Sequence, residues 1–271
     1  METSGTQSLM GAFRLVREIA ECDPTGVTLS ELVRTTGLTK PTAHRLLSAL
    51  LEQQLLCRDK SGRFHIGEFA YDLGVIASAR YRVRELCSLS MARLMEETQQ
   101  QIYLVTRKKN DSFCLDRRIG ASMTGVRETR LANRRPLGAA SSGVALLAAL
   151  PEGELNSIMH SNRARLEDYP GGWSVAEKNL RESRERGYAK VGGAVTTNGV
   201  GLSVAVLDFS GQPVAAITIA TNCALLTQEK ESSYVYLLQR ERRLIEKRLI
   251  TEHGGALHRE PPPRVYGNAR V

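Results

Sequence analysis

The sequence predicts an α+β protein in two parts, in which helices and a short β-hairpin precede an antiparallel sheet with flanking helices. Three observations predict this. Apolar residues recur at helical spacing in the first part of the chain, two short strand-like runs follow, and strand-like and helical runs alternate from residue 101 onward. The chain has 271 residues, of which 42% are hydrophobic, so it can fill the cores of two ordinary domains.

The first helix is predicted from apolar residues between positions 9 and 20. They recur every three or four positions, which gathers them on one side of a helix that can pack across the next two. The apolar residues of this face are Leu9, Ala12, Phe13, Leu15, Val16, Ile19 and Ala20.

Residues 29–48 predict two short helices joined by a tight turn. Gly37 ends the first helix, where a left-handed residue is needed, and Thr39 is a suitable N-cap for the second. Pro41 fits the first turn, which has no use for its missing N–H group. The apolar stripe of the second helix consists of Ala43, Leu46, Leu47, Leu50 and Leu51.

The second helix also has a polar face with no evident structural purpose. Short hydrogen-bonding side chains and one arginine near a helix N-terminus are what a helix needs to read bases in a DNA major groove. The alternative is a helical hairpin with an ordinary solvated face, and the pattern alone favours neither. The candidate DNA contacts in and before this helix are Thr28, Ser30, Thr39, Lys40, Thr42, His44, Arg45 and Ser48.

A short hairpin after these helices favours DNA binding. Residues 55–58 and 63–66 have the composition of strands, and residues 59–62 form a turn that contains glycine. Three helices followed by a hairpin make a winged helix-turn-helix. Arg58, Lys60 and Arg63 of this wing would suit contacts to DNA phosphates.

Residues 8–67 resemble the N-terminal domain of the IclR family of bacterial transcriptional regulators. The runs that carry the resemblance are LSELVRTTGL, TKPTAHRLLSALLEQQLL and RDKSGRFHIG. A second hallmark of the family lies far downstream, as RPLGAASSG at residues 135–143 followed by VALLA. Two separate matches in the right order indicate that the resemblance extends over most of the chain.

The resemblance implies the division of the chain. Residues 8–67 would be the DNA-binding domain, and residues 68–84 a linker helix that contributes to a dimer interface. The alternative for this apolar helix is packing against its own chain. Residues 85–252 would form a GAF-like domain for effector binding and oligomerisation, and the proline-containing tail 253–271 is expected to be disordered. A homodimer, or a homotetramer, would bind a palindromic double-stranded operator.

The second part is predicted to contain two hairpins and several helices. The strands are expected at 102–105, 112–115, 201–208 and 214–221. Helices are expected at 141–150, 152–160 and 174–185, with Ser174 as the cap of the third. A long final helix would begin at Thr227 and end before Gly254, and one serine of Ser141–Ser142 is expected to cap its helix.

The resemblance also implies a small-molecule effector, but several positions depart from the family's usual residues. The segment 190–197, KVGGAVTT, replaces an acidic run, and less polar residues replace a frequent Thr and positions often held by Ser or Cys. We therefore expect an effector less polar than glyoxylate or pyruvate, or none. The candidate effector-binding residues are Leu115, Met123, Ala140, Ser141, Gly201, Ser203, Thr218 and Ala220.

Several other functions find no support in the sequence. The five cysteines are scattered and form no metal-ligand spacing with the histidines, so we expect reduced thiols, no metal and no cofactor. Ser141–Ser142 lacks a nucleophile motif and an identifiable base, which argues against an enzyme that uses its winged domain only for protein interaction. A DNA-binding regulator without an effector remains an alternative. No apolar run is long enough to span a membrane, and the first residues lack the pattern of a signal peptide, so we expect a cytoplasmic protein.

The net charge of +8 is weak evidence for nucleic-acid binding because of its distribution. Residues 1–66 hold eight basic against seven acidic residues, so most of the excess lies outside the candidate DNA-binding domain. Residues 28–66 hold six against three, which still allows a local basic patch.

Overall fold

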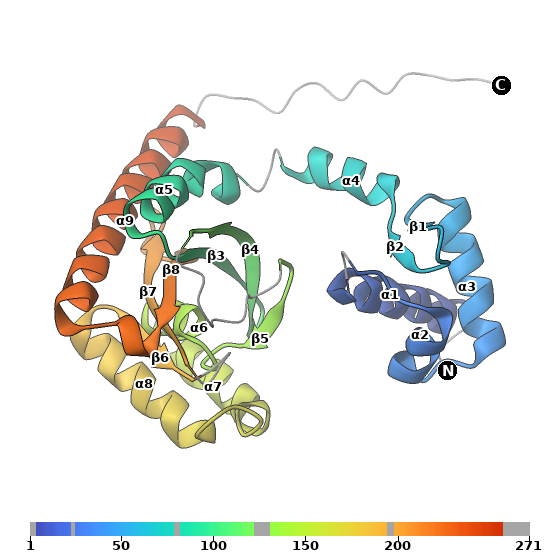
Figure 1. Ribbon diagram of the computed structural model, residues 1–271, viewed down its shortest axis with the longest axis horizontal. Coiled ribbons are helices and arrows are strands. Elements are labelled where there is room, and N and C mark those ends of the chain that lie inside the picture. Colours follow the sequence, from blue (N-terminus) through green and yellow to red (C-terminus); the bar gives the residue numbers. More distant parts are fainter. Residues whose placement is uncertain (1–3, 23–24, 79–81, 122–130, 194–197, 257–271) are drawn as a thin grey trace. The chain divides into compact units, whose positions relative to one another are not determined.

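The computed structural model describes residues 4–22, 25–78, 82–121, 131–193 and 198–256. The chain divides into two compact units, Met1–Arg82 and Val83–Val271 (Figure 1). Each unit has its own core and is described by itself.

The N-terminal unit contains helices and one short hairpin, as predicted. The elements are α1 (Ser4–Cys22), α2 (Leu29–Thr36), α3 (Lys40–Glu52), β1 (Leu56–Arg58), β2 (Phe64–Ile66) and α4 (Glu68–Ser78). The two strands pair in antiparallel fashion, and an isolated bridge joins Val27 to Phe64. This bridge fixes the chain before α2 against the hairpin.

Local sequence chemistry sets the ends of α2 and α3. Thr28 and Glu31 form a capping box at the start of α2, and Gly37 ends that helix in the left-handed region with φ of 68°. Thr39 then caps α3 by accepting a hydrogen bond from the Thr42 backbone. These caps satisfy backbone groups that the helix ends leave unpaired.

The core of this unit lies between the helices and the hairpin. Leu15, Ile19 and Leu32 are fully buried, and Leu47, Leu56 and Phe64 join them. The predicted apolar face of α1 is only partly correct, because Leu9 and Phe13 remain 58% and 49% exposed.

The C-terminal unit is built on a six-stranded antiparallel sheet with the strand order β5-β4-β3-β8-β7-β6. Its strands are β3 (Gln101–Lys108), β4 (Asp111–Ile119), β5 (Arg134–Pro136), β6 (Ala189–Gly192), β7 (Gly199–Leu207) and β8 (Pro213–Asn222). The four predicted strands are confirmed. The edge strands β5 and β6 were not predicted, because each is short and carries charged residues.

Helices cover both faces of this sheet (Figure 1). The helices α6 (Ser141–Ala148), α7 (Glu152–Leu166) and α8 (Gly172–Arg186) pack on one face, which we call the α6 face. The helices α5 (Val83–Thr98) and α9 (Gln228–Ala256) pack on the other, the α9 face, and a short 3-10 turn (Cys223–Leu225) precedes α9. This arrangement confirms the predicted α+β class.

Three expected helix ends in this unit were wrong. Ser174 does not cap α8, because the helix begins earlier, after the left-handed Gly171, and the Ser174 hydroxyl donates to the Gly171 carbonyl. Neither Ser141 nor Ser142 is an N-cap, since Ala140 holds that position without a side-chain bond. The last helix continues through Gly254.

The predicted linker and tail boundaries also shift. The helix α4 ends at Ser78, and α5 already begins at Val83, inside the predicted linker 68–84. Residues 253–256 of the predicted tail are helical, and residues 257–271 lie outside the described residues.

A buried carboxylate joins α5 to α9. The Glu241 side chain is fully buried, and it accepts hydrogen bonds from Arg93 Nε at 3.2 Å and from Arg240 Nε at 3.0 Å. Burial by itself would raise the pKa of Glu241, but the hydrogen bonds from Arg93, Ser90 and Arg240 outweigh it and lower the pKa.

We predict that Glu241→Gln lowers the free energy of unfolding by about 1.5–3 kcal/mol at neutral pH, because two arginines lose a charged acceptor. The folded-state pKa of Glu241 lies below the ordinary 4.5. Its contribution is therefore present above that pH and is lost as the pH falls through the folded value. Urea denaturation of both proteins over this pH range measures the difference.

Glu97→Gln is the matched control for this variant. Glu97 also binds Arg240, but its side chain is 39% exposed, so its loss should cost less than about 1 kcal/mol. Equal destabilisation by the two variants would contradict the role given to Glu241.

Candidate functional site

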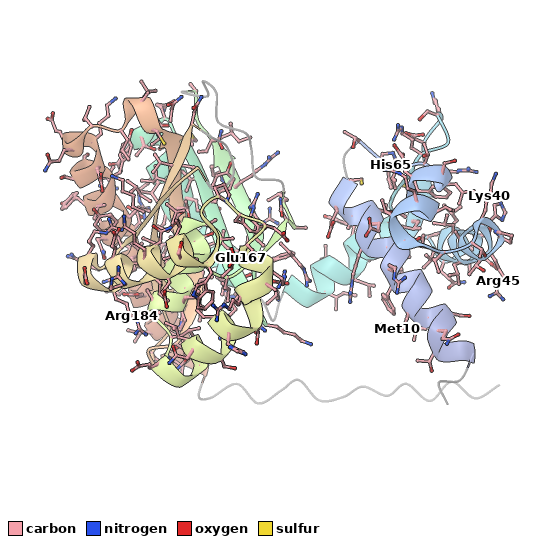
Figure 2. The ribbon with its side chains drawn as sticks, turned by 90° about the horizontal axis from the view of Figure 1, so that it is seen from below. Met10, Lys40, Arg45, His65, Glu167 and Arg184 are labelled. Atoms are coloured by element: carbon pink, nitrogen blue, oxygen red, sulfur yellow. The ribbon has the colours of Figure 1, made fainter. Side chains whose placement is uncertain are left out.

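The outer surface of α3 carries four exposed polar side chains. Lys40, His44, Arg45 and Ser48 are all exposed, while Ala43 and Leu47 face the core from the opposite side of the helix. Figure 2 shows Lys40 and Arg45 projecting outward from the unit. These four predicted DNA-binding residues therefore lie on the accessible side of α3.

The hydroxyl groups near this surface are partly used by the helix itself. The Thr39 hydroxyl donates to the Thr42 hydroxyl at 2.9 Å, and the Ser48 hydroxyl donates to the His44 carbonyl at 3.0 Å. Lys40 and Arg45 supply charge at the start and in the second turn of α3, where a helix that enters a major groove meets DNA.

The two candidates before α3 differ in their surroundings. The Thr28 hydroxyl donates to Glu31 Oε2 at 2.8 Å, so its main role is to cap α2. Ser30 is exposed in the first turn of α2. Glu31, which completes the capping box, was not singled out from the sequence, although Thr followed by Glu three positions later is the usual signal.

The turn of the wing is held by the Asp59 carboxylate. Oδ1 accepts hydrogen bonds from the Ser61 hydroxyl at 2.7 Å and from the backbone N–H groups of Ser61 and Arg63, while His65 Nε2 lies 3.1 Å from Oδ2. Hydrogen bonds from Ser61, His65 and the Arg63 backbone hold the pKa of Asp59 well below its ordinary value. The wing thus keeps a defined shape with an ionised Asp59 at neutral pH.

The three basic residues of the wing are not equivalent. Lys60 is exposed at the turn. Arg58 is exposed as well, with Nε donating to the Gly62 carbonyl at 3.1 Å and the guanidinium 4.8 Å from the centre of the Phe64 ring. Arg63 instead donates to the Gly26 carbonyl at 3.1 Å and lies 3.5 Å from Glu31 Oε2. Arg58 and Lys60 are therefore the better placed pair for phosphate contacts.

In the C-terminal unit, three predicted effector residues meet on the α6 face. Ser203 and Thr218 are opposite each other on β7 and β8, and Ser141 begins α6 above them. The Ser203 oxygen lies 2.8 Å from the Ser141 oxygen and 2.7 Å from the Thr218 oxygen. All three side chains are buried, and each of the three oxygens has a hydrogen-bond partner within this hydroxyl cluster.

Gly201 lies beside the hydroxyl cluster and has no room for a side chain. A Cβ atom at Gly201 would approach the Ser141 oxygen to 2.3 Å. Ala220 pairs with Gly201 across the sheet, and Ala220 and Ala140 are both partly buried. The structure thus brings together Ala140, Ser141, Gly201, Ser203, Thr218 and Ala220 of the predicted set.

One predicted effector residue, Leu115, does not join this group. Leu115 packs against the core on the α9 face, whereas its neighbour Cys114 packs on the α6 face with Tyr103. Successive strand residues point to opposite faces, so Leu115 lies on the other side of the sheet from Ser203 and Thr218. Met123 lies outside the described residues.

Asn162 is a positioning residue that the sequence reasoning missed. It is buried in α7, and its Nδ2 donates to the carbonyls of Asn110 at 2.7 Å and Leu137 at 3.2 Å. These bonds hold the loop 137–140, which leads into α6 and which we call the hallmark loop because it lies within the run RPLGAASSG. An asparagine inside an amphipathic helix was the available signal, but it did not reveal the partners.

A cavity of about 20 Å³ lies next to the hallmark loop. Gly138 and Ala139 line it from that loop, and Val191 and Gly192 line it from β6. This volume is about that of a single water probe, so in this state it has no space for an organic effector.

Within the described residues, no group of three His, Cys, Asp or Glu side chains is arranged to hold a metal ion. The thiols of Cys87 and Cys114 are buried, and burial raises the pKa of Cys87 to about 12 and that of Cys114 to about 11. Over the same residues, no helix is both long and apolar enough to cross a membrane.

Two family descriptions match this chain in the order of its two units. Residues 8–60 match the IclR helix-turn-helix domain, and residues 76–246 match the C-terminal domain of the bacterial transcriptional regulator IclR.

Curated relatives with this organisation are transcriptional regulators. The chain is 25% identical to the transcriptional repressor IclR of Escherichia coli over 242 residues, which are 86% of each chain. It is 27% identical to the regulator KipR of Bacillus subtilis over 207 residues, 75% of this chain and 82% of that protein. The repressor AllR of Salmonella typhimurium is 29% identical over 215 residues, 74% and 75% of the two chains.

Solved structures share the fold. An IclR homolog from Microbacterium hydrocarbonoxydans, crystallised with 4-hydroxybenzoate, superposes with a TM-score of 0.75 at 23% identity, covering 90% of this chain and 99% of that chain. The Thermotoga maritima IclR gives a TM-score of 0.69 at 23% identity, with the same coverage.

The relatives are regulators rather than enzymes, which agrees with the expectation from the sequence. Because a family description covers more than half of its residues, the chain belongs to the IclR family of transcriptional regulators, with a helix-turn-helix DNA-binding domain and a C-terminal effector-binding domain.

Proposed function

We propose that α3 is the recognition helix and that its exposed N-terminal half reads the operator. One observation carries this proposal. Lys40, His44 and Arg45 are all exposed on a helix whose opposite face packs in the core. Arginine can bind a guanine edge through two hydrogen bonds, so Arg45 is assigned the base contact. Arg58 and Lys60 of the wing contact phosphates.

We predict that Arg45→Ala weakens binding to the specific operator by about 1–3 kcal/mol, or about 5- to 140-fold in Kd. Binding to random DNA should change far less, because a base contact carries the sequence preference. The operator is first obtained by selection from a random DNA library, and Kd values are then measured by fluorescence anisotropy at fixed salt.

Two variants serve as controls for this test. Arg17→Ala removes an exposed arginine from α1 and should leave operator affinity unchanged. Lys60→Ala should weaken binding to operator and to random DNA alike. It should also reduce the salt dependence of the affinity by the contribution of about one phosphate contact. An Arg45→Ala protein with unaltered operator affinity would reject the assignment.

We also propose that α4, together with the start of α1, forms part of a homodimer interface. Large apolar side chains on these helices remain solvent-exposed in a single chain, which is typical of an association surface. On α4 these are Phe69, Tyr71, Leu73 and Ile76, and on α1 they are Leu9, Met10 and Phe13. A dimer would present two recognition helices to a palindromic operator, and such a regulator would work in the cytoplasm.

Ile76→Asp tests the role of α4, since Ile76 is 73% exposed and a buried carboxylate at an interface is costly. The variant should sediment as a smaller species than the unmodified protein at the same concentration, with unchanged helical content by circular dichroism. Phe209→Asp, at a similarly exposed residue of the β7–β8 turn, should keep the original sedimentation. Unchanged assembly of Ile76→Asp would contradict the proposal.

For the effector, we propose a molecule less polar than glyoxylate or pyruvate that binds on the α6 face near Ala140 and Ala220. Two features support this. The hydroxyl groups of Ser141, Ser203 and Thr218 are already paired with one another, and Gly201 supplies no side chain. A small keto acid would find few free polar partners there. A relative of the same fold was crystallised with 4-hydroxybenzoate, which has a larger apolar body than either keto acid.

Thermal-shift measurements compare 4-hydroxybenzoate and other aromatic or aliphatic acids with pyruvate and glyoxylate. A ligand at a hundred times its Kd should raise Tm by roughly 5–10 °C. Ala220→Leu should remove the shift by filling the site, whereas Ala224→Leu, at an exposed position, should retain it. Selective stabilisation by a keto acid would overturn the proposal.

A further inference from the structure

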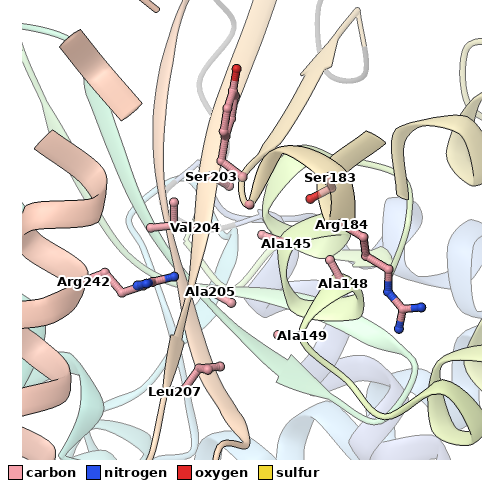
Figure 3. A pocket seen from close by; sticks show the side chains of 12 residues that line it. Ala145, Ala148, Ala149, Ser183, Arg184, Ser203, Val204, Ala205, Leu207 and Arg242 are labelled. Carbon is pink, nitrogen blue, oxygen red and sulfur yellow. The ribbon is translucent and has the colours of Figure 1, made fainter. Parts of the chain in front are cut away.

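A larger cavity, of about 180 Å³, lies on the C-terminal unit beside the edge of β7 (Figure 3). The edge strand β6 pairs only with residues 200–203 of β7. Val204, Ala205 and Leu207 therefore lie beyond the end of β6, and they line the cavity. The space exists because the shorter edge strand stops before β7 does.

The wall opposite β7 is made of small apolar side chains. Ala145, Ala148 and Ala149, at the C-terminal end of α6, contribute it. Ser203 also borders the cavity, but its hydroxyl is bonded to Ser141 and Thr218 and is not available. The cavity thus differs from the proposed effector site, which lies at the opposite, N-terminal end of α6.

Two arginines supply positive charge from opposite sides. Arg242 reaches from α9 toward Ala205, and Arg184 belongs to α8 (Figure 3). Nε of Arg242 is buried, and no described residue accepts a hydrogen bond from it. The Arg242 guanidinium is therefore not fully paired by the described residues.

Two further contacts of the arginines are given by the structure. The Glu246 carboxylate lies 3.7 Å from Arg242 Nε, and its Oε1 accepts a hydrogen bond from the Leu207 backbone at 3.0 Å. Arg184 donates one bond to the Leu150 carbonyl at 3.2 Å. The guanidinium groups of Arg184 and Arg242 together with the Glu246 carboxylate leave one positive charge. A ligand with a single anionic group would balance it.

The size and lining of the cavity limit what fits. Its volume is about six times the share of one water molecule in the liquid, which suits a compact ring or a short branched chain. The alanine wall would contact an apolar body, and a guanidinium group matches the two oxygens of a carboxylate.

We infer that this cavity is a second ligand site, which binds a small monocarboxylate with a compact apolar body. The carboxylate pairs with the Arg242 guanidinium, and the ring or branched chain lies against Ala148 and Ala149. This site is independent of the effector site proposed near Ala140 and Ala220.

The test uses the full chain labelled with ¹³C on its alanine methyl groups, titrated with cyclohexanecarboxylate and followed by NMR. Binding here should shift the methyl signals of Ala148, Ala149 and Ala205. Shifts confined to Ala140 and Ala220 would place the ligand at the effector site and overturn the inference. The absence of any saturable shift would overturn it as well.

Matched ligands and variants identify the group that binds the carboxylate. Cyclohexanecarboxamide, which has the same body without the charge, should bind at least about tenfold more weakly. Arg242→Gln should weaken the acid by a similar factor, while Arg243→Gln, at the exposed neighbouring position, should not. Equal affinity for Arg242→Gln and the original chain, or an equal loss with Arg243→Gln, would contradict the assignment.

A third variant, Ala148→Leu, fills the cavity without changing charge. It should abolish the shifts of Ala149 and Ala205, and its melting temperature shows whether the fold is retained. If it does not fold, the comparison of Arg242→Gln with Arg243→Gln still decides the outcome.

Discussion

The pairing of β7 with β8 is the constraint on which the C-terminal unit depends. Both faces of the sheet are buried under helices, so successive residues in the middle of these strands alternate between one core and the other. The register that pairs Ser203 with Thr218 places both hydroxyl groups under Ser141. A slip of one residue would move them into the apolar core under α9, at the cost of unpaired buried oxygens.

Sequence reasoning succeeded where local chemistry decides the structure. Thr39 and Gly37 marked helix ends because a cap and a left-handed turn need those side chains, and the glycine turn of the wing was recognisable in the same way. The family resemblance then predicted that the two units together form one regulator. Composition and net charge could not have predicted this.

Contacts between distant parts of the chain explain why other features were not predicted correctly. Leu9 and Phe13 have the same spacing as the buried residues of α1, and the sequence cannot tell which apolar residues other elements will cover. The positions of Asn162 and Arg242 depend on contacts with segments far away in the chain, such as Asn110 and Ala205. The strand β6 escaped prediction because four residues are too few for a periodic pattern.

The contact between Gly201 and Ser141 has a consequence for how effector preference could evolve in this protein. A serine or cysteine at position 201 would collide with the Ser141 hydroxyl, which is itself bonded to Ser203. A polar side chain at position 201 therefore needs a compensating change at Ser141, so the two positions on β7 and α6 can only change together.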